Sequence, residues 1–412
     1  MTGPTTADAQ RKRPLRGEAL VFEDSPARFG LARLASSLRP GAGAGTGPLR
    51  HTEDFAPPAI DADSWVRIRP RLAGICGSDL AAVDGRSSRW FEPIVSLPFV
   101  PGHEVVADHD GRRVVLEPVL GCVARGVHPL CGACANGDLG RCERLSHGHL
   151  EPGLQTGFCE STGGAWASEM SAHLSQLHEV PDELDDTAAV MVEPTACALH
   201  AALSAGIASE DTTAVIGAGT MGLAVVAAIA RHCPPRQLVV AARHPHQQDL
   251  ARSLAGSLPT TVATDAQLIR AVRRVTGTMV IGSGAQQRCT GGVDVTIDCV
   301  GTSSSLALAL AVTRPGGRVV MVGMPGVTTV DLTPLWQREI ALSGAYTYGT
   351  ERVDGTEYRT FDLAMELVAA ADLGALVSAT YPLSRSTDAI AHAAAAGRRG
   401  ATKICFDPQG TR

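Results

Sequence analysis

Four cysteines lie close together in the first half of the 412-residue chain, at spacings that suit a metal ion. Cys131, Cys134 and Cys142 form a C-x2-C-x7-C pattern, and Cys122 precedes them with eight residues between. Four thiolates suit a closed tetrahedral zinc site that holds a loop together and leaves no position for chemistry. We predict a structural zinc here, with Cys159 as an alternative to Cys122 and an incidental cluster of free thiols as the simpler explanation.

A second set of residues offers a different ligand chemistry. Cys76 and the pair His103-Glu104 each follow a strand-like run and lie beside a glycine. One thiolate, one imidazole and one carboxylate would leave a position for water or a substrate oxygen, as a catalytic zinc requires. Taken singly, Cys76 is more commonly explained as a core cysteine and His103 as a hydrogen-bonded histidine. The prediction of a catalytic zinc therefore depends on the three residues occurring together.

A glycine-rich motif, G-x-G-x-x-G, lies between a predicted buried strand and an alanine-rich predicted helix. Gly217 allows a tight turn, Gly219 lets the backbone approach a pyrophosphate, and Gly222 allows close packing of helix on strand. The free N–H groups of the helix N-terminus, where Thr220 and Met221 lie, would bind the phosphates. A plain tight turn is the alternative, but the strand and helix on either side favour a dinucleotide site.

The end of the next predicted strand indicates which nicotinamide binds. A carboxylate that accepts from the ribose 2′-hydroxyl is expected there, but the chain continues Ala242-Arg243-His244. Arg243 could pair with a 2′-phosphate through charge-assisted hydrogen bonds, with His244 as a weaker candidate. We predict that NADP(H) is favoured over NAD(H); the alternative is that Arg243 is only a solvated loop cation.

The elements that must position these residues change in character along the chain. The first part is β-rich and loop-rich, and its Gly/Ala/Pro-rich stretch at 39–47 is typical of a loop or surface insertion. From about residue 185, alanine-rich helices alternate with short buried strands, which predicts a parallel sheet covered by helices on both faces. The predicted strands are 18–22, 65–72, 112–117, 213–216, 237–241, 293–298, 318–322 and 403–406, and the predicted helices are 188–206, 361–371 and 386–395.

Composition excludes several classes of partner. The net charge of −6 and the aromatic share of 4% argue against nucleic acid and an anionic membrane. No run of about 20 apolar residues exists, and the polar, basic residues 1–16 predict a disordered tail rather than a signal peptide. Eleven cysteines without a secretory signal predict reduced thiols in the cytoplasm. We therefore expect a small-molecule substrate.

Over residues 17–408 the chain resembles the zinc-containing medium-chain dehydrogenase/reductases, nearest the polyol, glucose and threonine dehydrogenase branch. The resemblance rests on the segment 122–142 with its four cysteines, called the cysteine lobe below, and on six motifs. The motifs are GICGSD (74–79), PGHE (101–104), VEPTACALHA (192–201), VIGAGTMG (215–222), GGVDVTIDCVG (291–301) and RPGGRVVMVG (314–323).

The resemblance implies that Cys76, His103 and Glu104 bind the catalytic zinc, and that Glu193 either ligates it or holds its water. It implies that Ser78 passes the proton of the substrate hydroxyl onward and that Asp79 orients His103. Further cofactor contacts implied by the last two motifs are Val300, Val322 and Gly323.

The same resemblance implies an α/β fold in two units. A GroES-like β-barrel catalytic domain would comprise residues 17–189 and 345–412, and a Rossmann domain, a doubly wound parallel sheet, residues 190–344. The expected reaction is hydride transfer between a secondary alcohol or polyol, or its carbonyl, and the nicotinamide, in a homodimer or homotetramer. Trp90, Phe91 and Tyr346 could line the substrate pocket, although core packing is favoured for each.

Two departures from the family pattern are visible. Six extra residues separate Cys122 from Cys131, and Leu80-Ala81-Ala82-Val83 has no histidine to relay a proton beyond Ser78. A zinc-free reductase would lack Cys76 and His103-Glu104, and a non-catalytic homologue would be expected to have lost one of these groups. A zinc enzyme with net non-redox chemistry through transient oxidation stays open.

Overall fold

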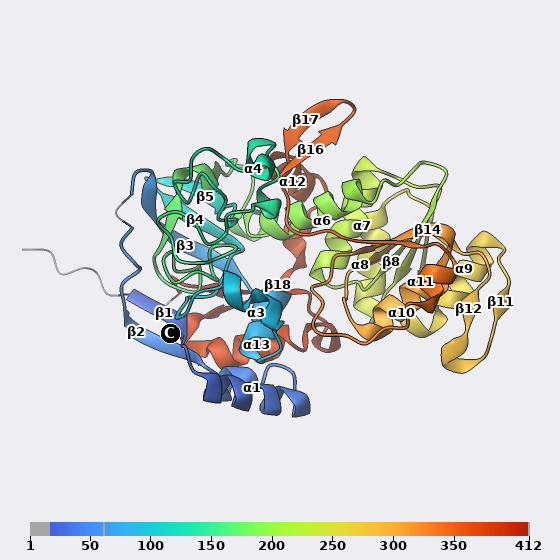
Figure 1. The fold of residues 1–412 in the computed structure, drawn as a ribbon, viewed down its shortest axis with the longest axis horizontal. Helices are drawn as coiled ribbons and strands as arrows, with labels where there is room; N and C mark the ends of the chain where they lie inside the picture. Colours follow the sequence, from blue (N-terminus) through green and yellow to red (C-terminus); the bar gives the residue numbers. More distant parts are fainter. Residues whose placement is uncertain (1–16, 61, 411–412) are drawn as a thin grey trace, which may run out of the picture.

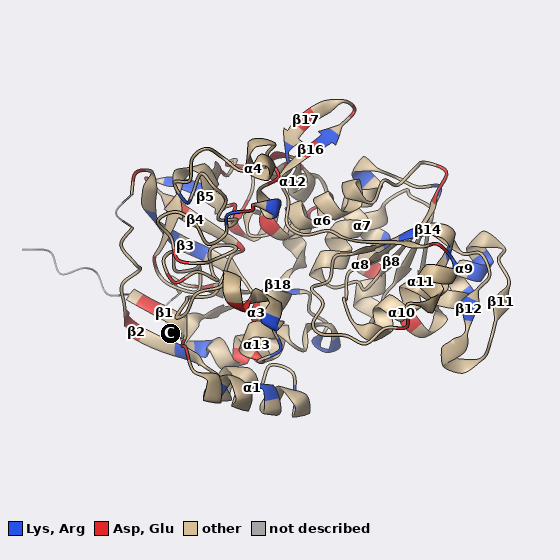
Figure 2. Cartoon of the chain, viewed as in Figure 1, with Lys and Arg blue, Asp and Glu red and all other residues tan. Residues whose placement is uncertain are grey.

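The computed structural model describes residues 17–60 and 62–410, so the predicted tail at 1–16 lies outside the described residues. Two halves lie side by side, with the N-terminal strands in blue to green and the parallel sheet in green to orange (Figure 1). Acidic and basic residues are interspersed over both halves (Figure 2). None of the described helices has the length and hydropathy to span a bilayer.

One half is built on a six-stranded sheet in the order β10-β9-β8-β13-β14-β15, and every neighbouring pair is parallel. This is the doubly wound order of a Rossmann fold, so the predicted parallel sheet is confirmed. The strands are β8 (Thr212–Ile216), β9 (Gln237–Ala241), β10 (Thr260–Ala263), β13 (Val293–Asp298), β14 (Thr313–Met321) and β15 (Ala341–Gly344).

Successive residues of a strand point to opposite faces of the sheet, so both faces present side chains to pack against. Helices cover both faces. On β8, Val215 belongs to the core shared with α6, α7 and α8, whereas Ala214 belongs to the core shared with α9 and α10. These helices are α6 (Val192–Ser204), α7 (Thr220–His232), α8 (Pro245–Ala255), α9 (Leu268–Thr276) and α10 (Ser303–Val312).

The other half is a mainly antiparallel sheet in the order β18-β19-β3-β4-β5-β7, with β6 also pairing β3. The last strand, β19, lies beside β3, and β18 pairs with β19, which brings the C-terminal segment back to the N-terminal half. The strands are β3 (Trp65–Gly74), β4 (Val105–His109), β5 (Arg112–Leu116), β6 (Met170–His173), β7 (Leu177–Glu179), β18 (Val377–Pro382) and β19 (Lys403–Asp407).

Smaller elements complete the fold. They are β1 (Gly17–Phe22), β2 (Leu49–Phe55), β11 (Val280–Ile281), β12 (Arg288–Cys289), β16 (Thr350–Val353), β17 (Thr356–Arg359), α1 (Pro26–Leu38), α2 (Gly43–Thr46), α3 (Gly77–Val83), α4 (Gly132–Ala135), α5 (Asp186–Ala189), α11 (Thr333–Gln337), α12 (Thr360–Ala370) and α13 (Ser386–Ala393).

The stretch at 39–47 corrects the sequence prediction of a loop or surface insertion. It contains α2, and the backbone N–H groups of Gly41 and Gly43 donate to the buried carboxylate of Asp84 at 2.9 and 3.2 Å. A Cβ at Gly43 would lie 2.0 Å from the carbonyl oxygen of Val83. The stretch has small residues because it packs tightly against the end of α3, and not because the chain is free there.

Candidate active site and metal centres

The first candidate site forms where β3 ends and β4 begins. The antiparallel register pairs Ala73 with Val105, so the segments just beyond these two residues lie side by side. Cys76 follows β3 as the N-cap of α3, and its backbone N–H donates to the carboxylate of Asp79 at 2.9 Å. His103 immediately precedes Glu104 and β4.

The three predicted ligands of the catalytic zinc come together. One ligand atom from each of Cys76, His103 and Glu104 lies within 4.8 Å of the others. Ser78 Oγ, Asp79 Oδ1 and His103 Nδ1 are buried there without a hydrogen-bond partner among the described residues. A thiol, an imidazole and a carboxylate with unsatisfied polar atoms around them fit a zinc ion with an open position.

Asp79, which the family resemblance implies orients His103, faces the imidazole. Its Oδ1 lies 3.6 Å from His103 Nδ1, and both side chains are buried. Burial raises the pKa of Asp79, although His103 opposes that shift. Burial lowers the pKa of His103, but Asp79 and Cys76 together outweigh it and raise this pKa well above the ordinary value. The pair therefore forms an electrostatic unit, and Asp79 can fix the orientation of the ring.

Lys403 is a buried residue of this site that the sequence prediction missed. Its Nζ forms an ion pair with Glu104 Oε2 and also donates to the carbonyl oxygen of Ile75 at 3.3 Å. Burial would lower the pKa of Lys403, but the Glu104 carboxylate and the Cys76 thiol together outweigh it and raise this pKa. The available signal was a lysine in the otherwise apolar run of β19, because lysines are rarely buried without a partner.

Glu193 approaches the same site from the first turn of α6, but it stands outside the group of three ligands. Its Oε1 accepts a hydrogen bond from the hydroxyl of Tyr348 at 3.2 Å and one from Cys197 Sγ at 3.7 Å. Burial raises the pKa of Glu193 to about 7, and the nearby His103 opposes the shift. Sequence reasoning identified neither partner; the signal for Cys197 was its place one helical turn after Glu193.

The four cysteines of the second candidate site are Cys122, Cys131, Cys134 and Cys142, and their sulfur atoms lie within 4.8 Å of one another. Cys159 is not in this group; its thiol donates to the carbonyl oxygen of Glu151 at 3.5 Å. Thus Cys122 and not Cys159 is the fourth member, and a four-cysteine structural zinc site is present.

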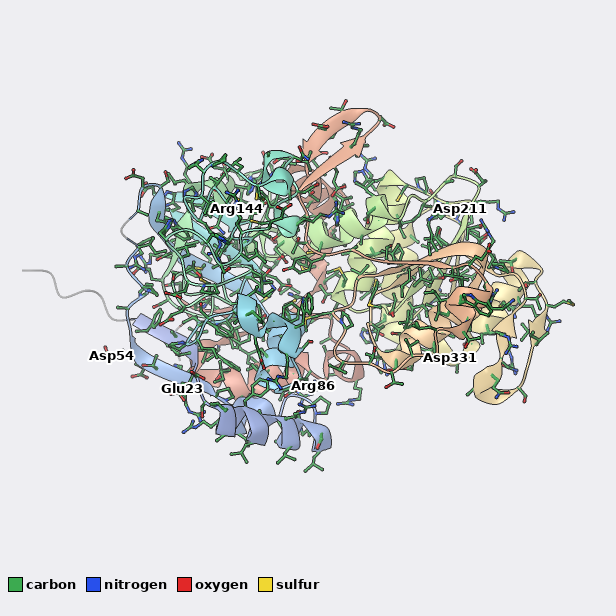
Figure 3. The ribbon with its side chains drawn as sticks, viewed as in Figure 1. Glu23, Asp54, Arg86, Arg144, Asp211 and Asp331 are labelled. Carbon is green, nitrogen blue, oxygen red and sulfur yellow. The ribbon has the colours of Figure 1, made fainter. Side chains whose placement is uncertain are left out.

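Backbone N–H groups stabilise negative charge on these sulfurs. Sγ of Cys131 accepts from the N–H of Cys134 at 3.5 Å, and Sγ of Cys142 accepts from the N–H of Arg144 at 3.4 Å. Arg144 is labelled in the upper part of the N-terminal half in Figure 3. Burial opposes ionisation of Cys131, but hydrogen bonds from the N–H groups of Glu143 and Cys134 lower its pKa to about 6. Thiolates are the form that binds zinc.

The extra residues between Cys122 and Cys131 carry a buried arginine. Arg125 is fully buried, and its guanidinium donates to the carbonyl oxygen of Leu120 at 3.0 Å and to carbonyl oxygens of the following loop, including that of Gly153 at 2.5 Å. The insertion therefore connects the loop at 147–153 to the cysteine lobe through hydrogen bonds. These bonds explain how Cys122 stays close to the other three cysteines despite the longer spacing.

The glycine motif adopts the geometry that a dinucleotide site needs. Gly217 has a φ of +92°, and a Cβ at Gly222 would lie 1.8 Å from the carbonyl oxygen of Gly217. Gly219 is the N-cap of α7, and a Cβ there would meet no atom within 4 Å. The open space at Gly219 would let a pyrophosphate approach the backbone at the start of α7. Thr220 and Met221 begin the helix, and Thr220 Oγ1 donates to the carbonyl oxygen of Thr402 at 3.4 Å.

The other predicted cofactor residues follow the carboxyl ends of neighbouring strands. Val300 follows β13, and its side chain limits the space at Gly217, where a Cβ would lie 2.5 Å from it. Val322 and Gly323 follow β14, and a Cβ at Gly323 would lie 2.4 Å from the carbonyl carbon of Val300. These turns pack closely against one another at the carboxyl end of the sheet. Ligands of doubly wound folds bind at this end.

Arg243 and His244 lie at the end of β9, next to this edge. Arg243 is 74% exposed and forms a 2.9 Å ion pair with Asp265. His244 is the N-cap of α8, and a Cβ at Gly397 would lie 2.7 Å from its ring. Arg243 is therefore available to a ligand, but a carboxylate already competes for its charge.

The three aromatic residues proposed for core packing or the pocket are not core residues. Trp90 is 80% exposed and Tyr346 is 51% exposed, and Phe91 is only partly buried. The preference for core packing was therefore wrong. Trp90 and Phe91 belong to a short 3-10 turn at Arg89–Ile94 with no buried residue. Tyr346 is exposed, although the residues that follow it, 347–349, are buried.

Comparison with known proteins adds to this geometry. The family description "Alcohol dehydrogenase GroES-like domain" matches residues 62–182, and "Zinc-binding dehydrogenase" matches residues 219–370. An L-idonate 5-dehydrogenase of Vitis vinifera is 29% identical over 296 residues, which cover 69% of this chain and 73% of the relative. A sorbitol dehydrogenase of Arabidopsis thaliana is 26% identical over 356 residues, which cover 83% and 88%.

The fold is shared with solved structures. An Escherichia coli oxidoreductase/dehydrogenase of unknown specificity superposes with a TM-score of 0.70 at 18% identity, covering 95% of this chain and 99% of that one. The chain belongs to the zinc-binding dehydrogenases of the medium-chain alcohol dehydrogenase family, with a GroES-like domain and a Rossmann-like cofactor domain.

Proposed function

We propose that this enzyme transfers a hydride between a secondary alcohol of a polyol-type substrate, or the matching carbonyl, and NADP(H). The observation that carries the proposal is the convergence of Cys76, His103 and Glu104, with the buried, unpartnered Oγ of Ser78 two residues after Cys76. The polyol class is supported by two relatives, an L-idonate 5-dehydrogenase and a sorbitol dehydrogenase.

Each residue of the site takes a defined part in this reaction. Zinc, when bound by Cys76, His103 and Glu104, supplies a Lewis acid for the substrate oxygen, and the nicotinamide supplies the hydride acceptor. Ser78 Oγ accepts the proton of the substrate hydroxyl while its own hydroxyl proton passes onward towards the nicotinamide ribose. Asp79 holds the ring of His103, and Lys403 balances the negative charge of the buried Glu104.

The proposed preference for NADP(H) rests on the end of β9. No carboxylate follows this strand to accept from a ribose 2′-hydroxyl, and Arg243 is exposed there. The ion pair with Asp265 weakens the attraction of Arg243 for a 2′-phosphate but leaves its other nitrogens free to donate, because a guanidinium has five N–H donors.

We also propose that two or four copies assemble through the edge of the Rossmann sheet. All four residues of the edge strand β15 are exposed, and Trp336 on the preceding helix α11 is 78% exposed. An exposed strand edge beside a large apolar side chain is a surface that a second copy can cover. Eleven thiols favour a reducing compartment, so we propose the cytoplasm.

We propose a division of the chain near residues 190 and 345, with 17–189 and 345–412 as the catalytic unit. The pairing of β19 with β3 supports the return of the C-terminal segment.

The proposed function is tested with purified enzyme, a panel of polyols, sugars and amino alcohols, and both nicotinamides. We expect net formation of NADPH with a polyol. Conversion of a substrate without net change in free nicotinamide would instead identify non-redox chemistry through transient oxidation.

A further inference from the structure

The active-site carboxylate Glu193 and the four-cysteine lobe are linked by one short segment, residues 346–349. Tyr348 lies in this segment, is 2% exposed, and donates its hydroxyl hydrogen to Glu193 Oε1 at 3.2 Å. The ring of Tyr348 packs edge-to-face on Phe361 with centroids 4.9 Å apart. The hydroxyl therefore has a fixed position from which to hold the carboxylate.

The other side of the same segment packs against the cysteine lobe. A Cβ at Gly140, two residues before Cys142, would lie 1.9 Å from Thr347 Oγ1 and 3.2 Å from the carbonyl oxygen of Tyr346. A Cβ at Gly349 would lie 2.5 Å from the carbonyl oxygen of Gly137. Both contacts are this close because the residues at the interface between the lobe and the segment are glycines. With such tight packing, the lobe and the segment cannot shift independently.

The segment has little freedom to adjust. Thr347 has a φ of +55°, which is unfavourable for a β-branched residue, and its side chain is buried. Beyond Tyr348, the backbone of Gly349 is held by Thr360, whose hydroxyl accepts from its N–H at 3.1 Å and donates to its carbonyl oxygen at 2.8 Å. A strained residue persists only where the surrounding structure fixes it, so Thr347 is held firmly between these two contacts.

We infer, on the basis of the proposed dehydrogenase function, that the four-cysteine lobe positions Glu193 through residues 346–349, with Tyr348 as the positioning residue. Glu193 stands outside the group formed by Cys76, His103 and Glu104 while Tyr348 and Cys197 hold its Oε1. Tyr348 thereby keeps this carboxylate beside the metal site in one orientation. The lobe then acts on the active site as well as stabilising its own loop.

The inference is tested with three variants and a matched control. Tyr348→Phe removes the hydroxyl, and Gly140→Ala places a methyl group against Thr347. Gly140→Ala/Thr347→Ala removes the obstructing hydroxyl as well. Gly132→Ala is the control, because Gly132 lies in the same lobe and a Cβ there would meet no atom within 4 Å.

Three quantities are measured: kcat and KM for the best polyol, and the affinity of the catalytic zinc by competition with a chelator without substrate. Residues that orient a metal site cost about 10- to 100-fold in metal affinity or activity when removed. We expect Tyr348→Phe and Gly140→Ala to lower kcat and catalytic zinc affinity in that range, with KM changed much less. Gly132→Ala should match wild type, and Thr347→Ala should restore most of the loss in Gly140→Ala.

Wild-type kcat and zinc affinity in Tyr348→Phe would overturn the role of Tyr348. A Gly140→Ala enzyme equal to Gly132→Ala, or a double variant without recovery, would overturn the link to the lobe. Should Gly140→Ala fail to fold, Gly349→Ala probes the same contact surface with the same expected result. Because zinc affinity is measured without substrate, this outcome is separate from whether the enzyme oxidises a polyol.

Discussion

At the scale of single residues, Ser78 is the proposed proton relay, and its removal should slow catalysis without disturbing the metal. Its buried Oγ has no partner among the described residues, so Ser78→Ala breaks no hydrogen bond between them. We expect kcat to fall by about 10²- to 10⁴-fold, the usual contribution of a positioned proton-transfer group, with the zinc content unchanged. Steady-state kinetics with metal analysis checks this, and an unchanged rate would assign the proton to another group.

Arg243 is the residue on which the proposed cofactor preference depends. One charge-assisted hydrogen bond contributes about 1.5–3 kcal/mol, or roughly 10- to 100-fold in affinity. We expect NADP(H) to be preferred by that factor and Arg243→Ala to remove the preference chiefly through KM. Ala242→Asp should go further, because it adds an acceptor for a 2′-hydroxyl and repels a 2′-phosphate.

Asp265→Asn is the opposing control for this prediction. It removes the carboxylate that competes for Arg243, so the preference for NADP(H) should rise. A wild-type enzyme that prefers NAD(H), or an unmoved ratio in Arg243→Ala, contradicts the interpretation of the end of β9.

At the scale of elements, the cysteine lobe should depend on its four thiols and not on Cys159. Structural zinc contributes directly to folding free energy, so Cys134→Ala should release one zinc and lower the melting temperature. Cys159→Ala is the matched control, because Cys159 is equally buried but lies outside the group of four. Loss of zinc in Cys159→Ala would show that the ligand set is wrong.

Much of the Rossmann half could be predicted from sequence, because buried parallel strands have short apolar runs with clear ends. The strands at 237–241 and 293–298 agree with β9 and β13 residue for residue. The stretch at 39–47 could not be predicted, because small residues are equally typical of loops and of close packing. Only the buried carboxylate of Asp84 distinguishes the two.

The metal-binding residues of the candidate site could be predicted because they lie in sequence motifs. Their hydrogen-bond and ion-pair partners were missed because they come from distant segments of the chain. Cys76, His103 and Glu104 are close in the fold because β3 pairs β4. Lys403 and Tyr348 reach the site from the C-terminal quarter of the chain, and a single lysine or tyrosine carries no spacing signal. Their roles follow only from the sheet order and from the contacts of residues 346–349.

At the scale of the whole molecule, the edge of the Rossmann sheet should hold the copies together. Leu342 lies in the edge strand β15 and is 37% exposed. In an interface between two identical edges, a charged residue of one copy lies near the same charge of the other and is repelled by it. We therefore expect Leu342→Glu to reduce the assembly to smaller species. Light scattering after size exclusion measures the mass. Leu31→Glu on α1, another exposed leucine, should leave the mass unchanged, and equal masses for all three proteins would contradict the proposed interface.

The central claim is that a zinc held by Cys76, His103 and Glu104 serves alcohol oxidation, while a second zinc holds the cysteine lobe. The most direct measurement is the zinc content of wild type and Cys76→Ala, taken together with NADPH formation from a polyol. We expect two zinc ions per chain and NADPH formation in wild type, and one zinc, a retained fold and no NADPH in Cys76→Ala. A Cys76→Ala enzyme that keeps both zinc ions, or one that still forms NADPH at the wild-type rate, would contradict the claim.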